Sequence, residues 1–189
     1  MPNWCNNSIA IQGPTDTIKQ LWEDAHQEEG GFGLLNAMVP MPKELEGTTS
    51  PGDTPNWYDW RVDNWGTKWD IDDTGLEFTD HGDGTAEISG WFDSAWAPPI
   101  DAYNAFLDMM DNCYITASYH EGGMDFGGFY DNGSVEECND CYAQSKLPHD
   151  EQDDVFKRLD DEYDLSSSYE MWDDDEEDVD LTDLSPNTV

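Results

Sequence analysis

Two cysteines near position 140 have the spacing of a metal-binding or redox motif. Cys138 and Cys141 form a Cys-x-x-Cys pair, which can supply two thiolate ligands to zinc. The sequence contains no second pair of this kind, and the other possible ligands come from separate segments: Cys5, Cys113, His120 and His149. The strand-helix-strand context of a thioredoxin-type redox centre is also missing. We therefore expect free thiols, with Cys138 and Cys141 as weak zinc candidates, and no cofactor.

Carboxylates are far more numerous than any other reactive group, with 44 Asp and Glu against 7 Lys and Arg. The runs 70–73 and 173–178 lack the glycine and the final glutamate of an EF-hand calcium loop. No carboxylate pair stands out as a general acid and base. The four histidines lie in different segments, and the chain has neither a nucleophile elbow nor a phosphate-binding loop. The sequence predicts that the protein is not an enzyme.

The net charge of −37 over 189 residues points to a partner outside the fold. Charge of one sign on this scale destabilises a compact chain by self-repulsion. Residues 1–147 carry 27 acids and 5 bases, and residues 148–189 carry 17 acids and 2 bases, which gives −22 and −15. Affinity for nucleic acid comes from Lys and Arg that neutralise phosphates. We therefore expect a basic protein partner, and neither nucleic acid nor a membrane.

The order of expected elements predicts an α+β fold with a split βαβ, ferredoxin-like antiparallel sheet and two helices. Polarity alternates in the first strand, and Ile18, Leu21, Trp22 and Ala25 then form one helical stripe. The expected elements, in order, are a strand at 7–13, a helix from 15, a hairpin at 75–92, a helix from 100, a strand at 114–119 and an edge strand at 125–130. The expected domains are a ferredoxin-like domain over 1–147 and an extension over 148–189.

An aromatic-rich insertion over about 32–69 interrupts this pattern. Residues 34–39 read as a short strand or turn, whereas residues 57–69 contain four tryptophans and give no clear backbone assignment. With Arg61 and Lys68, these rings could stack bases or line a small-molecule pocket. Core packing is the favoured interpretation, with Arg61 stacked on a tryptophan or paired with an aspartate.

The acidic C-terminal extension is expected to be partly helical. Val155 and Leu159 suggest a weak helical stripe, which residues 166–168, three serines, are expected to interrupt. Residues 173–180 form a nearly continuous acidic run, which we expect to be disordered in the free protein.

Three sequence blocks resemble the YubB ferredoxin-like family of phage and plasmid proteins. They are Met1–Asn7, the Trp-rich stretch 57–69, and Phe92–Pro99, and the resemblance covers roughly residues 1–135. It implies a ferredoxin-like fold and an origin in a mobile element. It implies no established chemistry, so no catalytic residue is carried over. The acidic extension lies outside it.

These observations lead to the hypothesis of a DNA-mimicking inhibitor. Exposed carboxylates would occupy the basic groove of a host DNA-binding protein from a restriction, CRISPR or related defence system, which makes the protein an anti-restriction or anti-CRISPR candidate. The residues expected to present charge are Asp153, Asp154, Asp160, Asp161, Asp173, Asp174, Asp175, Glu176, Glu177 and Asp178. No apolar run approaches a membrane span and no signal peptide is evident, so we expect a cytoplasmic protein. Two alternatives stay open: adaptation to high salt, and a small-molecule or metal-binding module built on the insertion.

Overall fold

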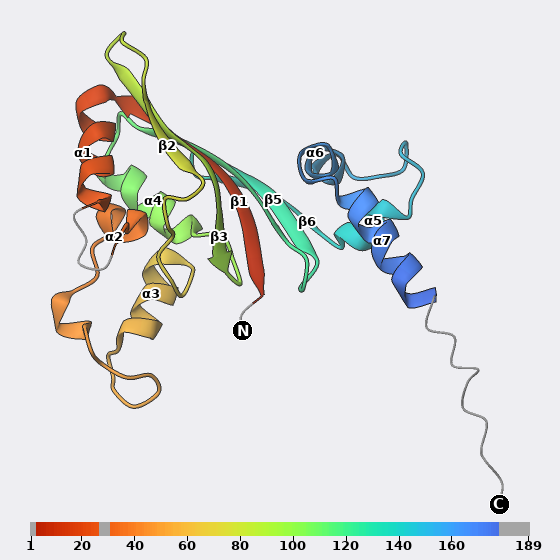
Figure 1. The fold of residues 1–189 in the computed structure, drawn as a ribbon, viewed down its shortest axis with the longest axis horizontal. Coiled ribbons are helices and arrows are strands. Elements are labelled where there is room, and N and C mark those ends of the chain that lie inside the picture. Colours follow the sequence, from red (N-terminus) through yellow and green to blue (C-terminus); the bar gives the residue numbers. More distant parts are fainter. Residues whose placement is uncertain (1–2, 27–30, 178–189) are drawn as a thin grey trace, which may run out of the picture.

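The computed structural model describes residues 3–26 and 31–177, which form one six-stranded antiparallel sheet flanked by helices (Figure 1). The strands are β1 Trp4–Pro14, β2 Leu76–Asp80, β3 Thr85–Ala95, β4 Tyr114–Glu121, β5 Phe126–Asp131 and β6 Ser134–Asn139. The helices are α1 Thr15–Ala25, α2 Leu34–Met38, α3 Trp57–Trp65, α4 Ile100–Met109, α5 Cys141–Ser145, α6 Asp154–Tyr163 and α7 Leu165–Glu177, with a 3-10 turn at Lys43–Leu45. The strand order is β2-β3-β1-β4-β5-β6. The fold is therefore α+β, as predicted.

Alternation along β1 sets the two faces of the sheet, because successive side chains of a strand point to opposite sides. Ile9 and Ile11 are buried, whereas Ser8 and Ala10 are only partly covered. Ile11 lies opposite Ile88 of β3 and Ile115 of β4, so the buried face continues across three strands. This face packs against helices α1 to α4. The opposite face, called the open face below, is covered in part by α6 and α7 and borders a groove elsewhere.

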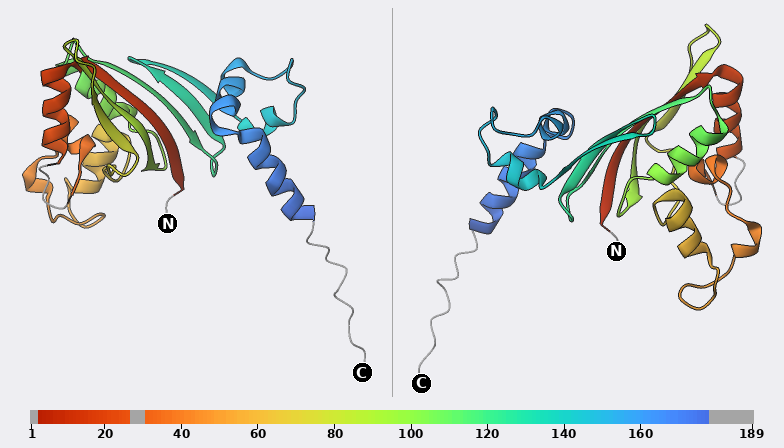
Figure 2. Two further views of the ribbon diagram at one scale, coloured as in Figure 1. Left: turned by 45° about the horizontal axis from the view of Figure 1, so that its top comes forward. Right: turned by 180° about the vertical axis from the view of Figure 1, so that it is seen from behind.

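The main core lies between the buried face of the sheet and four helices, α1 to α4 (Figure 2). The expected stripe of α1 is confirmed, since Ile18, Leu21 and Ala25 are all buried. The insertion lies on this same side of the sheet. Its segment 34–38 is helical, so the expectation of a short strand or turn is wrong. Asp70 explains the difference, because its carboxylate accepts hydrogen bonds from two backbone N–H groups at the start of α2.

The Trp-rich stretch forms helix α3, which has a defined cap at each end. The buried Asn56 side chain accepts hydrogen bonds from the N–H groups of Tyr58 and Asp59, each at 3.0 Å. At the other end, Gly66 adopts a left-handed conformation with φ of 81°. Trp65 is fully buried in the main core. The expected packing role of the insertion is confirmed for this residue.

Strand β6 corrects the sequence-based prediction that β5 forms the edge of the sheet. An Asn132-Gly133 turn, with both residues at positive φ, folds β6 back onto β5. Of the β6 side chains, only Cys138 is buried. An edge strand that buries one side chain has no apolar alternation, so periodicity alone could not identify it.

A second, smaller core joins the C-terminal helices to the sheet. It consists of Cys138, Cys141, Phe156, Leu159, Leu165 and Tyr169, with Phe129 of β5 packed against it. The C-terminal segment thus shares a core with strands β5 and β6 (Figure 1).

Helix α7 includes the three serines that were expected to interrupt the helical stripe, so this expectation is wrong. The break lies two residues before the first serine, at Asp164, whose φ is 52°. Ser166 donates from both its N–H and its hydroxyl to the Asp160 carboxylate. The Asp160 carboxylate thus satisfies a backbone N–H group at the start of α7 that has no partner within the helix. The helix then continues to Glu177. Disorder of the acidic run in the free protein stays a prediction, and its residues beyond 177 lie outside the described residues.

Candidate functional site

The predicted charge-presenting residues of α6 divide into two groups. Asp153 caps the helix by accepting hydrogen bonds from the N–H groups of Val155 and Phe156, and Asp160 binds Ser166 at the start of α7. Asp154 and Asp161 are exposed, and Asp154 pairs with its neighbour Lys157 at 3.0 Å. Two of the four carboxylates therefore also stabilise the helices.

The remaining predicted residues lie at the end of the described chain. Asp173, Asp174, Asp175, Glu176 and Glu177 belong to the last part of α7, and Asp178 lies outside the described residues. Their role in charge presentation stays a prediction.

Most of the few cations are already engaged within the protein. Arg61 lies 5.3 Å from the ring centre of Trp57 and 4.7 Å from that of Trp65, as expected from the sequence. The other engaged cations and their partners are Lys19 with Glu23, Lys68 with Tyr58, Trp69 and Trp96, Lys146 with Tyr142, Lys157 with Asp154, and Arg158 with Phe129 and Glu136. Because these cations already contact aromatic rings or carboxylates, they contribute little to the binding of nucleic-acid phosphates.

Cys138 and Cys141 come together at the junction of β6 and α5, but as buried thiols. The Cys141 thiol donates to the carbonyl oxygen of Cys138 at 3.6 Å. Burial raises the pKa of both thiols, so the thiolates that zinc requires are disfavoured. Among the described residues, no group of three His, Cys, Asp or Glu side chains is arranged to hold a metal ion.

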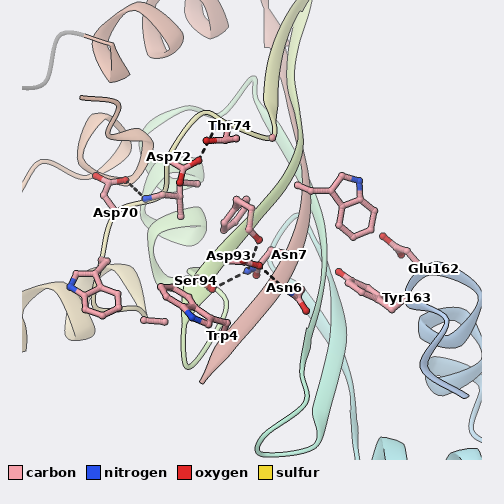
Figure 3. A pocket seen from close by; sticks show the side chains of 16 residues that line it. Trp4, Asn6, Asn7, Asp70, Asp72, Thr74, Asp93, Ser94, Glu162 and Tyr163 are labelled. Carbon is pink, nitrogen blue, oxygen red and sulfur yellow. Dashed lines mark hydrogen bonds between the residues drawn. The ribbon is translucent and has the colours of Figure 1, made fainter. Parts of the chain in front are cut away.

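A groove of about 810 Å³ lies on the described surface, and the sequence analysis did not predict it. It passes the end of β3, between the loop 69–75 and the end of α6 (Figure 3). Figure 3 shows Asp93 and Asn6 on the strands, with Glu162 and Tyr163 facing them from α6. Its full lining is Trp4, Asn6, Asn7, Trp69, Asp70, Ile71, Asp72, Thr74, Gly75, Trp91, Phe92, Asp93, Ser94, Ala95, Glu162 and Tyr163.

A shallower hollow of about 430 Å³ continues along the open face of the sheet. It shares Trp91 and Glu162 with the larger groove. Its floor consists of small side chains from three neighbouring strands: Ser8, Ala10, Ser89, Thr116 and Ser118. A ligand can therefore approach the sheet closely here.

Helices α6 and α7 are held over the open face by two sets of polar contacts. Ser118 of β4 lies 3.0 Å from the Tyr163 hydroxyl and donates to Glu162. His120 Nε2 lies 3.1 Å from the Tyr169 hydroxyl, which donates to Asp125 at 2.9 Å. Because that hydroxyl proton is used on Asp125, His120 must donate from Nε2.

Burial sets the ionisation of this polar contact region. It lowers the pKa of His120 and raises the pKa values of Tyr163 and Tyr169. All three groups are therefore neutral near pH 7. These neutral side chains hold α6 and α7 on the sheet through hydrogen bonds that include the Glu162 and Asp125 carboxylates.

A small hollow of about 330 Å³ lies in the insertion, where a ligand pocket was one expectation. It is lined by Met41, Glu46, Gly47, Trp57, Arg61 and Trp69. Arg61 lies between its two tryptophan neighbours, and burial lowers its pKa. The aromatic rings of this region serve mainly to pack the chain's own cation.

The groove residues could have been found in part from strand alternation. Trp4, Trp91 and Asp93 occupy positions out of phase with the buried residues of β1 and β3, and Trp4 and Trp91 remain 46% and 48% exposed. Large apolar side chains that gather on the solvent side of neighbouring strands indicate a binding surface, whereas a single one does not. No sequence pattern indicated that residues 69–75 and 162–163 lie beside these strand residues in the same groove.

No family model matches the chain, and no curated protein matches it. Among solved structures it is similar to the protein api92 from Yersinia pseudotuberculosis, which is described under the family name DUF1281. The identity is 17%, the TM-score is 0.39, and the match covers 59% of this chain and 42% of that chain. The chain thus spans less than half of that protein's length.

In the described residues, no helix has both the length and the apolar character needed to cross a membrane.

Proposed function

We propose that the protein is a DNA mimic that binds a basic nucleic-acid-binding protein and inhibits it by occupying its DNA groove. The observation that carries this proposal is the combination of a net charge of −37 with cations that are held on aromatic rings or carboxylates. The surface available to a partner is therefore dominated by carboxylates. A host restriction, CRISPR or related defence component has the required basic groove.

The scaffold in this proposal is ferredoxin-like and of phage or plasmid origin. The strand order β2-β3-β1-β4, with α1 and α4 on one face, supports the first part. The resemblance of three sequence blocks to the YubB family supports the second. A mobile element benefits from an inhibitor of host defence.

The open face of the sheet is unsuited to nucleic acid, although similar sheets in other proteins stack RNA bases. Carboxylates occupy the open-face positions of three strands: Glu87 and Asp93 on β3, Asp131 on β5 and Glu136 on β6. Glu162 of α6 adds another beside the groove. Phosphates would be repelled from this face.

A competition experiment tests the proposal. Candidate basic nucleases, bound to a labelled DNA duplex, are titrated with the protein at several salt concentrations. We expect displacement of DNA with an affinity that falls steeply with salt, because steering between opposite charges is screened. Displacement that does not depend on salt would contradict mimicry.

Charge position is tested with matched neutral variants. Asp154→Asn with Asp161→Asn removes two exposed charges from α6, whereas Asp63→Asn with Asp108→Asn removes two exposed charges from α3 and α4. We expect the α6 pair to weaken displacement more than the control pair. Asp153 and Asp160 are left intact, because their substitution would also weaken the helices.

Adaptation to high salt is a second candidate, favoured by the spread of acids over the whole molecule. Exposed acids occur on helices of both sides and at the β2–β3 turn, for example Asp16, Asp63, Asp83 and Asp161. A halophilic protein should unfold at low salt, whereas a DNA mimic should stay folded at about 0.15 M salt. Urea unfolding over a series of KCl concentrations separates the two.

A further inference from the structure

Aromatic side chains stand on both sides of the 810 Å³ groove. Trp4 packs against Trp69, with ring centres 5.7 Å apart, and Trp91 packs against Tyr163, with ring centres 5.4 Å apart. Trp4 and Trp91 nevertheless stay about half exposed. Their free surface faces solvent in a hollow, where an exposed indole ring can attract a cation.

Two carboxylates of the groove each accept a hydrogen bond at one oxygen, which orients the side chain and leaves the second oxygen available to a ligand. Asn6 donates to Oδ1 of Asp93 at 2.6 Å, and Ser118 donates to Oε1 of Glu162 at 2.5 Å. Within the described part of the chain, the second oxygen of each has no hydrogen-bond partner. A carboxylate held in this way can accept a further donor without a large loss of side-chain entropy.

The backbone of β3 adds further hydrogen-bonding groups at the same place. Trp91 N–H donates to the carbonyl of Gly75, and Ala95 N–H donates to the Thr67 hydroxyl, so these alternate residues face the β2 side of the strand. Asp93 lies between them and faces the same side. The ladder between β2 and β3 ends at Gly90, so β2 does not cover the backbone of Asp93.

The chain already holds arginine by the same combination of groups elsewhere. The Arg158 guanidinium lies 3.9 Å from the ring centre of Phe129 and 2.5 Å from a Glu136 oxygen. This arrangement stacks a planar cation on a ring and pairs its edge with a carboxylate. The groove offers both partners with no internal cation among its lining residues.

We propose that this groove is the docking site for an arginine side chain of the basic partner protein, which stacks on Trp91 or Trp4 and pairs with Asp93 and Glu162. This inference rests on the proposed function, since it names the contact by which that partner is held. A guanidinium suits the site better than an ammonium, because it is planar, carries five donors and is weakly hydrated. The carboxylates exclude anions.

The experiment uses a blocked tripeptide, acetyl-Gly-Arg-Gly-amide, and the full protein labelled with nitrogen-15. The citrulline analogue is the neutral control, and the lysine analogue tests the choice of cation. We expect the arginine peptide to shift the indole N–H signals of Trp4, Trp69 and Trp91, and to leave that of the exposed Trp172 unchanged. The citrulline peptide should bind at least several-fold more weakly.

Variants locate the site. Trp91→Leu should weaken arginine binding about two- to fivefold, the loss expected for one exposed cation–π contact. Asp93→Asn keeps the shape of the side chain and should weaken binding by a similar factor. Trp172→Leu and Asp63→Asn are the matched controls and should leave the affinity unchanged. Circular dichroism confirms that each variant is folded.

Three outcomes would overturn the inference: equal shifts at Trp172, equal binding of citrulline, or equal losses in the control variants. Equal binding of lysine would overturn the assignment to arginine. The experiments distinguish an error in the arginine-site proposal from an error in the DNA-mimicry proposal. If Trp91→Leu and Asp93→Asn leave DNA competition intact, the groove assignment fails and mimicry stands. If arginine binds at the groove but no basic protein is displaced from DNA, mimicry fails.

Discussion

Truncation of Leu159 to alanine should release α6 and α7 from the sheet. Leu159 is fully buried, and its Cδ1 atom would lie only 2.9 Å from a methyl group built at Gly127 of β5, so it packs directly on the strand backbone. The change removes three buried carbon atoms, which at about 0.8 kcal/mol each is about 2.4 kcal/mol of transfer free energy. The cavity that remains raises the expected loss to about 3–4 kcal/mol.

Urea unfolding followed by circular dichroism measures this loss, and amide hydrogen exchange shows where it falls. A loss of 3 kcal/mol corresponds to a decrease of roughly 6–12 °C in melting temperature for a chain of this size. Leu147→Ala is the matched control, because Leu147 is 39% exposed and should lose less than about 1 kcal/mol. The arginine peptide should also bind more weakly to Leu159→Ala, since Glu162 and Tyr163 form one side of the groove.

The packing described for α6 would be refuted by a loss below about 1 kcal/mol together with unchanged exchange of its amides. Faster exchange restricted to α1 or β1 would also contradict it, because those elements belong to the other core. The expected result is faster exchange of α6 and α7 amides first.

Three further outcomes are expected. Asn56→Ala should cost about 1–2 kcal/mol in urea unfolding, because it removes the acceptor for two N–H groups of α3, and a loss under about 0.3 kcal/mol would count against this cap. Asp153→Ala should cost about 1 kcal/mol by the same reasoning for α6, whereas Asp154→Ala, with an exposed side chain, should cost much less, and equal losses would disprove the distinction. Burial lowers the pKa of His120 from 6.5, so the unfolded chain binds its proton more readily and the free energy of unfolding falls as pH decreases below about 6.5. His120→Gln should remove this contribution, which is measured as the difference between the two pH profiles, and identical slopes would refute it.

Local sequence patterns predicted most of the sheet and its two crossover helices. The alternation in β1 and the stripe of α1 are strong because one side of each element is buried and the other is not. The same reasoning failed for α2, because five residues are too few to show a helical period. What makes α2 a helix is a carboxylate more than thirty residues away, on Asp70.

The sequence predicted the chemical type of the functional residues but not the structural role of each one. The abundance of carboxylates indicated a surface for a basic partner, and the acids of α6 were chosen for their charge. Their division into helix caps and exposed charges depends on hydrogen bonds that the chain order does not reveal. The exposed tryptophans of β1 and β3 carried a signal, since they lie out of phase with the core.

The net charge and the side of each strand that faces the core follow directly from residue type and spacing, because both are local properties. The groove does not. It forms where the start of β1, the loop 69–75, the end of β3 and the end of α6 come together, through strand register and the second core. Contacts between residues so distant in sequence depend on how whole elements pack, and only the folded structure establishes that.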